Sequence, residues 1–177
     1  MRNTFDGWRR ALTIVRPENS GDIAAIREVH VVSFPSDAEA RLVEQLRDAG
    51  HLTVSLVAEV DGRVVGHVAF SPVSAGTGIP GVGLAPIAVL PGHRCRGIAG
   101  ELVTRGLEKC ASLGCGWAVV LGDPGYYSRF GFRAAQGLGL LDEYDGGSAF
   151  QAIELVAGSL PVGAGLVSYA PEFASVV

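Results

Sequence analysis

Apolar and polar positions follow two different periods along the chain, and the two periods separate expected helices from expected strands. Apolar residues spaced three and four apart indicate amphipathic helices, whereas short apolar or alternating runs indicate strands. Helices are expected at 22–34, 36–50, 97–113 and, as a short one, 124–130. Strands are expected at 12–16, 53–60, 63–70, 82–89, 117–121 and 150–156, and the Gly-rich tail to Val177 has room for one more. This order predicts an α/β layered domain.

Capping and turn residues indicate where these elements begin and end. Asp22 is expected to cap the first helix with its carboxylate. Ser36 and Glu39 have the spacing of a capping box, in which each side chain satisfies the other residue's backbone N–H. Asp61-Gly62 has the composition of a two-residue hairpin turn between two strands.

The segment Val64–His93 contains no Asp, Glu, Lys or Arg and is longer than the ~20 residues of a membrane-spanning helix. Several prolines and glycines inside it, including Pro72, Pro80 and Pro86, would break such a helix. We therefore expect two buried strands joined by a turn-rich link.

Length and composition indicate one globular domain. The chain has 177 residues, of which 48% are hydrophobic, and this is enough to bury a core. Residues 1–11 have the pattern of an N-terminal extension and 12–177 that of the domain. Arg and Asp occupy the first residues where a signal peptide needs an apolar core, so a cytoplasmic protein is expected. A net charge of −4 argues against a nucleic-acid partner.

Two motif matches carry little weight. Gly76-Thr-Gly-Ile-Pro-Gly81 fits the G-x-G-x-x-G dinucleotide pattern, but it lies between two expected strands and does not open a helix.

Three cysteines cannot form a disulfide framework. Their spacing fits no standard zinc site, and Cys95 beside His93 lacks a third partner for nucleophilic catalysis. We expect reduced thiols and no bound metal.

The segment 84–100 has the composition of an anion-binding site. A buried strand leads into a loop that carries Arg94 and Arg96, and the loop leads directly into the longest amphipathic helix. Free backbone N–H groups, the helix dipole and two guanidinium groups can together hold a pyrophosphate. Gly97, Ala99 and Gly100 are small enough to let phosphates approach the backbone.

These residues also resemble a known family. Arg94-x-x-Gly97-x-Ala99, preceded by Ile87-Ala88-Val89 and Pro91, fits the [Q/R]-x-x-G-x-[G/A] signature of the GCN5-related N-acetyltransferase (GNAT) superfamily. Tyr127-Ser-Arg-Phe-Gly131-Phe132 resembles the Tyr-x-x-x-Gly-Phe element of the same superfamily. The string 119–132 is similar to a bacterial subgroup called YhbS-like. So is the C-terminal pattern formed by Glu154-Leu155, Gly165, Tyr169 and Phe173.

The resemblance implies a single GNAT-like domain with a mixed central sheet and helices on both faces. In this fold two central strands splay apart, and Val82–Val89 and Trp117–Leu121 are the candidates. Pro86 and nearby glycines are expected to supply a bulge.

The resemblance further implies an N-acetyltransferase that uses acetyl-CoA as co-substrate and needs no metal. A primary amine would attack the thioester directly, and a backbone N–H near Ala88 would hold the thioester oxygen. The expected cofactor-binding residues are Ile87, Ala88, Val89, Arg94, Cys95, Arg96, Gly97, Ile98, Ala99 and Gly100.

Tyr127 is the expected general acid, because it stands four residues before Gly131 as the family element requires. Tyr126 is the rival, and it lies on another face of a helix because one residue turns by roughly 100°. The general base stays open among Asp37, Glu39, Glu59 and His67.

The sequence departs from the family at two places. Many members have an Asn where this chain has Leu121-Gly-Asp-Pro124, and the uncharged segment Val64–His93 excludes the carboxylate that many members use as base.

The acceptor is expected to be a small-molecule amine or a peptide, and a homodimer is compatible with the sequence. Two other functions stay open. One is a non-catalytic acyl-CoA sensor on the same fold. The other is an acetyltransferase acting on protein N-termini or aminoacyl-tRNA. No membrane partner is expected.

Overall fold

The computed structural model describes residues 12–175, and the predicted extension 1–11 lies outside them. Its centre is a mixed sheet in the order β1-β2-β3-β4-β5-β8-β6. The strands of this path are β1 (Thr13–Pro17), β2 (Val54–Val60), β3 (Arg63–Ser74), β4 (Gly81–Val89), β5 (Trp117–Leu121), β8 (Phe150–Glu154) and β6 (Arg133–Ala134). Only the β4–β5 pair on this path is parallel.

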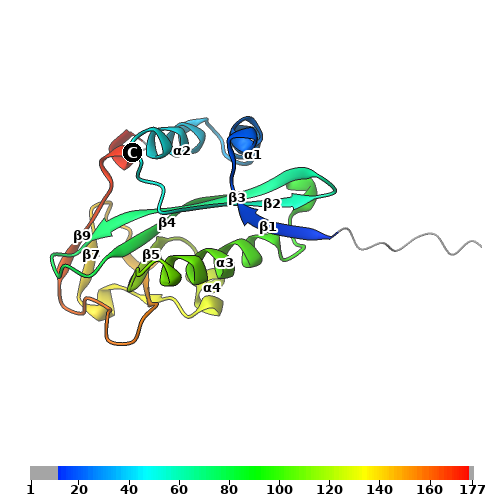
Figure 1. The fold of residues 1–177 in the computed structure, drawn as a ribbon. Helices are drawn as coiled ribbons and strands as arrows, with labels where there is room; N and C mark the ends of the chain where they lie inside the picture. The colour runs from blue at the N-terminus through cyan, green and yellow to red at the C-terminus, as the bar shows by residue number, and fades with distance from the viewer. Residues whose placement is uncertain (1–11, 176–177) are drawn as a thin grey trace, which may run out of the picture.

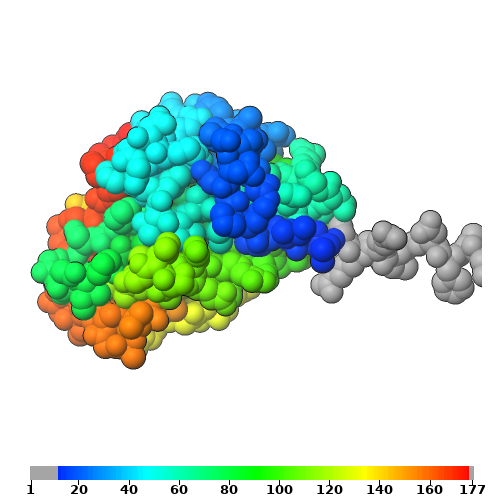
Figure 2. All heavy atoms as spheres, in the orientation of Figure 1, coloured from blue at the N-terminus to red at the C-terminus, as the bar shows by residue number. Residues whose placement is uncertain are grey.

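Helices cover both faces of the sheet, as the resemblance implied. Helices α1 (Ile23–Ser33) and α2 (Ala38–Asp48) lie on one face, and α3 (Ile98–Ser112) and α4 (Pro124–Tyr127) on the other (Figure 1). The space-filling view shows the blue and cyan N-terminal helices packed over one side of the strands and the yellow-green α3 on the opposite side (Figure 2). The mixed sheet and the helices on both faces are thereby confirmed.

The core forms between the sheet and α3. The predicted apolar stripe of α3 is buried, with Ile98, Leu102 and Cys110 at most 4% exposed. Gly106 lets the helix approach β3 closely, because a Cβ there would collide with the ring of Phe70. The middle of α3 therefore packs directly against β3.

Both capping predictions are wrong in their partners. Asp22 makes no side-chain cap bond to α1, because its carboxylate pairs with Arg16 and accepts from the backbone N–H of Asn19. Helix α2 begins after Asp37, again without a side-chain cap bond. Ser36 Oγ does accept from the N–H of Ala38 at 3.2 Å, but the reciprocal bond expected from Glu39 is not formed. Asp22 therefore stabilises the turn before α1 rather than the first turn of the helix.

The predicted hairpin and the uncharged segment have the expected structures. Asp61 and Gly62 both take positive φ values, 51° and 78°, between β2 and β3. The segment Val64–His93 forms β3 and β4 with a turn-rich link, and β3 runs to Ser74, past its predicted end. A strand follows the G-x-G-x-x-G match, so the match lacks the helix that a dinucleotide site needs. No helix within 12–175 is long and apolar enough to cross a membrane.

Two strand pairs were not anticipated. The tail strand β9 (Gly165–Tyr169) confirms the expected extra strand, but it pairs with the unpredicted β7 (Leu140–Asp142) and with the end of β3. Strand β6 is two residues long and pairs with β8. Such short pairings depend on distant partners and leave little periodic signal in the sequence.

Candidate functional site

Strands β4 and β5 diverge along their length. The ladder between them covers only Gly81–Gly83 opposite Trp117–Val119, and within the described residues the rest of β4 pairs with β3 alone. The register of β3 and β4 shifts so that Ala85 and Pro86 together face Ala69. The expected splay and the expected bulge at Pro86 are both present. The bulge bends β4 away from β5 and opens one edge of β4.

The hydrogen bonds around Val89 show which backbone groups of β4 are free at this edge. Leu90 N–H donates to the carbonyl of Val65 on β3 at 2.8 Å. The Val89 carbonyl accepts instead from Ser33 Oγ (3.3 Å) and Arg94 Nε (2.9 Å), so Val89 faces away from β3. Antiparallel ladders alternate, and therefore the N–H groups of Ile87 and Val89 face the gap while that of Ala88 faces β3. The candidates for the backbone donor predicted near Ala88 are therefore the N–H groups of Ile87 and Val89.

Two adjoining cavities lie along this edge and below the loop after β4. The first, which we call the strand-side cavity, has a volume of about 370 Å³. It is lined by Ser33, Phe34, Ile87, Ala88, Val89, Arg94, Ala99 and Tyr126. The second, the loop-side cavity, has about 330 Å³ and is lined by Val89, His93, Arg94, Cys95, Gly97, Ile98, Ala99, Gly100, Tyr126 and Arg129. Four shared residues join the two into one groove.

The loop between β4 and α3 has the geometry of an anion site. Gly97 takes φ 83° directly before α3, and Cys95 takes φ 59°. The N–H groups of Ile98, Ala99 and Gly100 lie in the first turn of the helix, where no intrahelical acceptor exists, at the positive end of the helix dipole. The loop-side cavity borders this turn and is lined by Arg94, whereas Arg96 is exposed and lines neither cavity. The fold therefore brings the predicted cofactor-binding residues other than Arg96 to one groove.

The two tyrosines have different surroundings. Tyr126 lines both cavities, and the Arg129 guanidinium lies over its ring at 4.4 Å. Tyr127 is buried, with its ring edge-on to Phe132 at 5.7 Å and against Gly122 at the end of β5. Burial raises the pKa of Tyr127 to about 12, so its phenol stays protonated. Tyr127 thus packs against the residue that follows β5, whereas Tyr126 faces the groove, and the choice of Tyr127 as acid stays a prediction.

Three of the four candidate bases are carboxylates, and two of them lie in ion pairs. Asp37 pairs with Arg27 and Arg41, and Glu59 pairs with Arg16. Glu39 is half-buried on α2. These carboxylates lie outside the linings of both cavities.

His67 has different surroundings from the other three. It is fully buried on β3 directly opposite Ala88, a residue that lines the strand-side cavity. Its ring nitrogens contact Ser55 and His30 at 2.8 Å each. His67 is thus the cross-strand neighbour of a residue that lines the groove.

Several residues that line the groove were not predicted from the sequence. Ser33 and Phe34 end α1, and Arg129 follows α4. No local pattern in the sequence indicates that the end of α1 borders β4.

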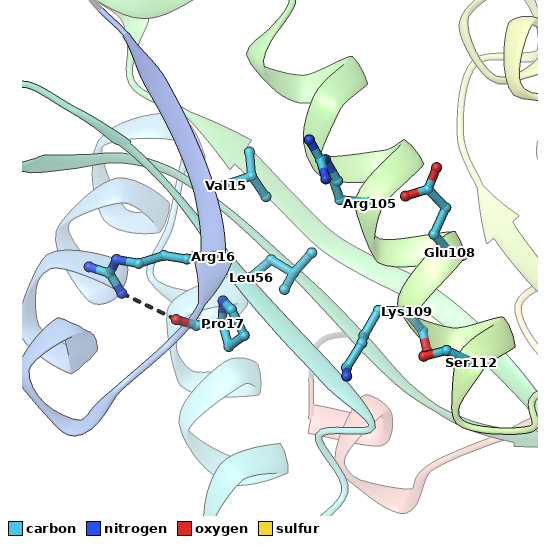
Figure 3. A pocket seen from close by; sticks show the side chains of 8 residues that line it. All are labelled: Val15, Arg16, Pro17, Leu56, Arg105, Glu108, Lys109 and Ser112. Atoms are coloured by element: carbon cyan, nitrogen blue, oxygen red, sulfur yellow. Dashed lines mark hydrogen bonds between the residues drawn. The ribbon is translucent and has the colours of Figure 1, made fainter.

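A third hollow lies apart from this groove. It has about 330 Å³ between β1, β2 and the C-terminal half of α3 (Figure 3). Val15 and Leu56 face Arg105, Glu108 and Lys109 across it (Figure 3). The hollow has mixed charge and no helix start, so it lacks the features of an anion site.

The cysteines have ordinary surroundings. Cys110 and Cys115 are buried, Cys95 is exposed, and burial raises the pKa of Cys110. Within 12–175 no group of three or more His, Cys, Asp or Glu side chains could hold a metal ion. A reactive thiolate needs a lowered pKa, so Cys110 is unsuited to nucleophilic chemistry.

Comparison with known proteins identifies relatives along most of the chain. The sequence model of the Acetyltransferase (GNAT) family matches residues 23–132. The chain is 44% identical over 163 residues to the Escherichia coli K12 protein named Uncharacterized N-acetyltransferase YhbS, covering 90% of this chain and 98% of that protein. It is 33% identical over 125 residues to Uncharacterized N-acetyltransferase YjhQ of the same strain, covering 67% of this chain and 68% of that protein.

Solved structures are similar over the same length. The crystal structure of the GNAT family N-acetyltransferase YhbS from Escherichia coli in complex with CoA matches with a TM-score of 0.90 and 41% identity, covering 96% of each chain. A GNAT family acetyltransferase from Brucella melitensis in complex with acetyl-CoA matches with a TM-score of 0.77 and 36% identity, covering 93% of this chain and 99% of that one. The splayed strands, the loop before α3 and these matches agree, and the chain belongs to the GNAT acetyltransferase family.

Proposed function

We propose that the protein transfers the acetyl group of acetyl-CoA directly to a primary amine of a small molecule or a peptide. The observation that carries this proposal is the open edge of β4, where free N–H groups lead without interruption into the anion site of α3. Two relatives bind CoA or acetyl-CoA in their crystal structures, which supports the same donor here.

The chain would hold the donor through backbone groups. The N–H groups of Cys95 to Gly100 would surround the pyrophosphate, with Arg94 and Arg96 adding positive charge. Val89 N–H would bind the amide chain that follows in the donor. Ile87 N–H would donate to the thioester oxygen, where negative charge develops as the amine attacks. Arg94 fixes this arrangement because its Nε donates to the Val89 carbonyl.

Two proton transfers complete the reaction. The acceptor ammonium must lose a proton before it can attack, and the departing thiolate must gain one. Tyr127 is our candidate for the second transfer, because its ring contacts the end of β5. Its raised pKa keeps the proton available at neutral pH.

The strand-side cavity limits the acceptor to compounds that tolerate an apolar wall. Phe34, Ile87 and Ala88 line it, with Arg94 as the charged side chain. An amine on a flexible arm fits such a cavity better than a nucleic acid does, given the net charge of −4. The cytoplasmic location and the homodimer stay predictions of the sequence.

A screen of primary amines tests the proposal. The purified protein is incubated with acetyl-CoA and a panel of polyamines, amino sugars, amino acids and short peptides, and the release of free thiol is measured. We expect saturable thiol release with at least one amine and formation of its amide by mass spectrometry. Acetyl-CoA binding by calorimetry without transfer to any amine would instead indicate the acyl-CoA sensor. Transfer only to protein N-termini or to charged tRNA would indicate the third function.

A further inference from the structure

A chain of buried polar side chains runs behind the wall of the strand-side cavity. Arg47 on α2 donates two hydrogen bonds to the Glu18 carboxylate, at 2.8 and 2.9 Å. The Ser55 hydroxyl on β2 donates to the same carboxylate, and His67 Nε2 lies 2.8 Å from Ser55 Oγ. His30 Nε2 on α1 lies 2.8 Å from His67 Nδ1. Within residues 12–175, the buried Nδ1 of His30 has no hydrogen-bond partner.

These contacts fix the proton positions on both histidine rings. Burial acts to raise the pKa of Glu18, but hydrogen bonds from Arg47 and Ser55 and the nearby His67 ring outweigh it, so Glu18 is an ionised acceptor. The Ser55 hydroxyl donates its one proton to Glu18, so Ser55 Oγ must accept from His67. His67 therefore carries its proton on Nε2. His67 Nδ1 then accepts from His30 Nε2–H. His30 Nδ1 is left as a bare lone pair that lacks a donor.

The two histidines lie directly behind the cavity. His67 and Ala88 are direct cross-strand partners, so their side chains share the face of the sheet that α1 covers. The ring of His30 stacks on Phe34, with centroids 5.9 Å apart and 10° between planes. Phe34 and Ala88 both line the strand-side cavity, so each histidine is next to a residue of the cavity wall.

We propose that the His30–His67 pair takes up the proton that the acceptor ammonium loses, with one water molecule joining His30 Nδ1 to the strand-side cavity. The inference rests on the proposed function, because an amine acceptor supplies that proton. It replaces the carboxylate base that the uncharged β3–β4 segment does not contain.

The protons and electrons balance along this path. The water takes one proton from the ammonium and gives one to His30 Nδ1, so an N–H bond breaks on the acceptor and another forms on His30. The electron pair stays on the amine nitrogen, which attacks the thioester carbonyl. His30 passes its Nε2 proton to His67 Nδ1. The positive charge then rests on His67, whose Nε2 lies 3.6 Å from the Glu18 carboxylate.

The charges around the pair favour His67 over His30 as the final place of the positive charge. Burial, His67 and Arg47 lower the pKa of His30 to about 3, and burial lowers the pKa of His67, so both rings are neutral at pH 7 and the low pKa of His30 works against its holding the proton. Glu18 raises the pKa of His67 against the effect of burial, so the positive charge is favoured on His67 rather than on His30. Arg94 lines the cavity and disfavours a second cation in it, which lowers the pKa of an ammonium that enters.

The variant His30→Gln tests the relay with an amine that the panel identifies. Its amide N–H can still donate to His67, but the lone pair of Nδ1 is lost. At pH 7 we expect kcat to fall by about 10²–10⁴-fold, with acetyl-CoA affinity by calorimetry within about twofold of wild type. The loss should shrink as the pH approaches the pKa of the amine, because the acceptor then arrives neutral. A structural defect would lower the rate equally at every pH.

Two further variants accompany this test. Ser55→Ala removes the hydroxyl between His67 and Glu18, and its kcat should fall by less than that of His30→Gln, with the same dependence on pH. If circular dichroism shows that His30→Gln does not fold, Ser55→Ala provides the test. His51→Gln alters a histidine that pairs with Glu172 outside the relay and should leave kcat unchanged. An enzyme that acetylates the amine while His30→Gln and Ser55→Ala lose nothing, or lose equally at all pH values, overturns the relay and leaves the proposed function intact. Absence of transfer by the wild type to any amine overturns both.

Discussion

The anion site depends on single residues whose backbone takes a left-handed conformation. At Gly97, with φ 83°, a side chain would strain the backbone and stand where phosphate oxygens approach the loop. We expect Gly97→Val to weaken acetyl-CoA binding by at least about tenfold, since phosphate contacts of this kind are charge-assisted. Isothermal calorimetry on the folded variant measures this.

A matched variant separates backbone strain from the loss of the site. Gly78 lies in the β3–β4 link with φ 75° and open space around its Cα, as Gly97 does. Gly78→Val should therefore cost similar stability and leave acetyl-CoA affinity unchanged. If Gly97→Val binds within twofold of wild type, the pyrophosphate lies elsewhere.

A single phenol proton distinguishes the two candidate general acids, Tyr127 and Tyr126, from phenylalanine. Tyr127→Phe keeps the ring against Gly122 and Phe132 and removes only the proton. We expect kcat to fall by about 10²–10⁴-fold with acetyl-CoA affinity nearly unchanged, because general-acid catalysis typically contributes that much. The same assay on Tyr126→Phe decides between the neighbours: a loss there, with Tyr127→Phe active, assigns the role to the tyrosine that lines the groove.

At the scale of elements, helix α3 packs closely against β3 at Gly106. Gly106 faces Phe70, and a Cβ would collide with that ring. Gly106→Ala should destabilise the protein by about 1–3 kcal/mol, as overpacking does, even though Ala favours helices over Gly. Urea unfolding measures the change.

Gly100 on the same helix provides the control for that substitution. A Cβ there would meet only Phe130, at 3.9 Å, which is ordinary contact. Gly100→Ala should therefore leave stability unchanged or raise it by up to about 1 kcal/mol. Equal effects of the two substitutions would show that Phe70 can move aside, and that the close approach of α3 to β3 is not required.

The whole molecule should lose stability in acid, beginning with its buried histidines. The pKa of His30 falls from 6.5 unfolded to about 3 folded, chiefly through burial, so the unfolded chain binds the extra proton between these values. Stability is therefore full above about pH 6.5 and falls as the pH drops towards 3. For this one group the fall from pH 7 to pH 5 is about 2 kcal/mol.

Urea unfolding at pH 7, 6 and 5 measures this dependence. His67, whose pKa is also lowered by burial, adds to the slope, and Glu18 and Asp22, whose pKa values are held low by their partners, contribute below about pH 4.5. His30→Gln should flatten the curve between pH 7 and 5. An unchanged slope in that variant would mean that His30 binds its proton in the folded state.

Much of this fold and site follows from local sequence. The helix over 97–113 has an apolar stripe with charged residues off it, and such periodicity survives in almost any tertiary context. Trp117–Leu121 is apolar throughout because a central strand is covered on both faces. The loop signature from Arg94 to Ala99 combines charge, small residues and a helix start within six positions, so the chemistry of the anion site is local as well.

The tertiary structure alone decided which side chains meet across elements. Asp22 was predicted to cap a helix, but its carboxylate pairs with Arg16 on β1 and accepts from the N–H of Asn19. Which N–H groups of β4 are free depends on the bulge opposite Ala69, which shifts the register. The His30–His67 contact joins residues 37 positions apart. Periodicity places a residue on a face, whereas the partner on that face is set by how distant elements pack.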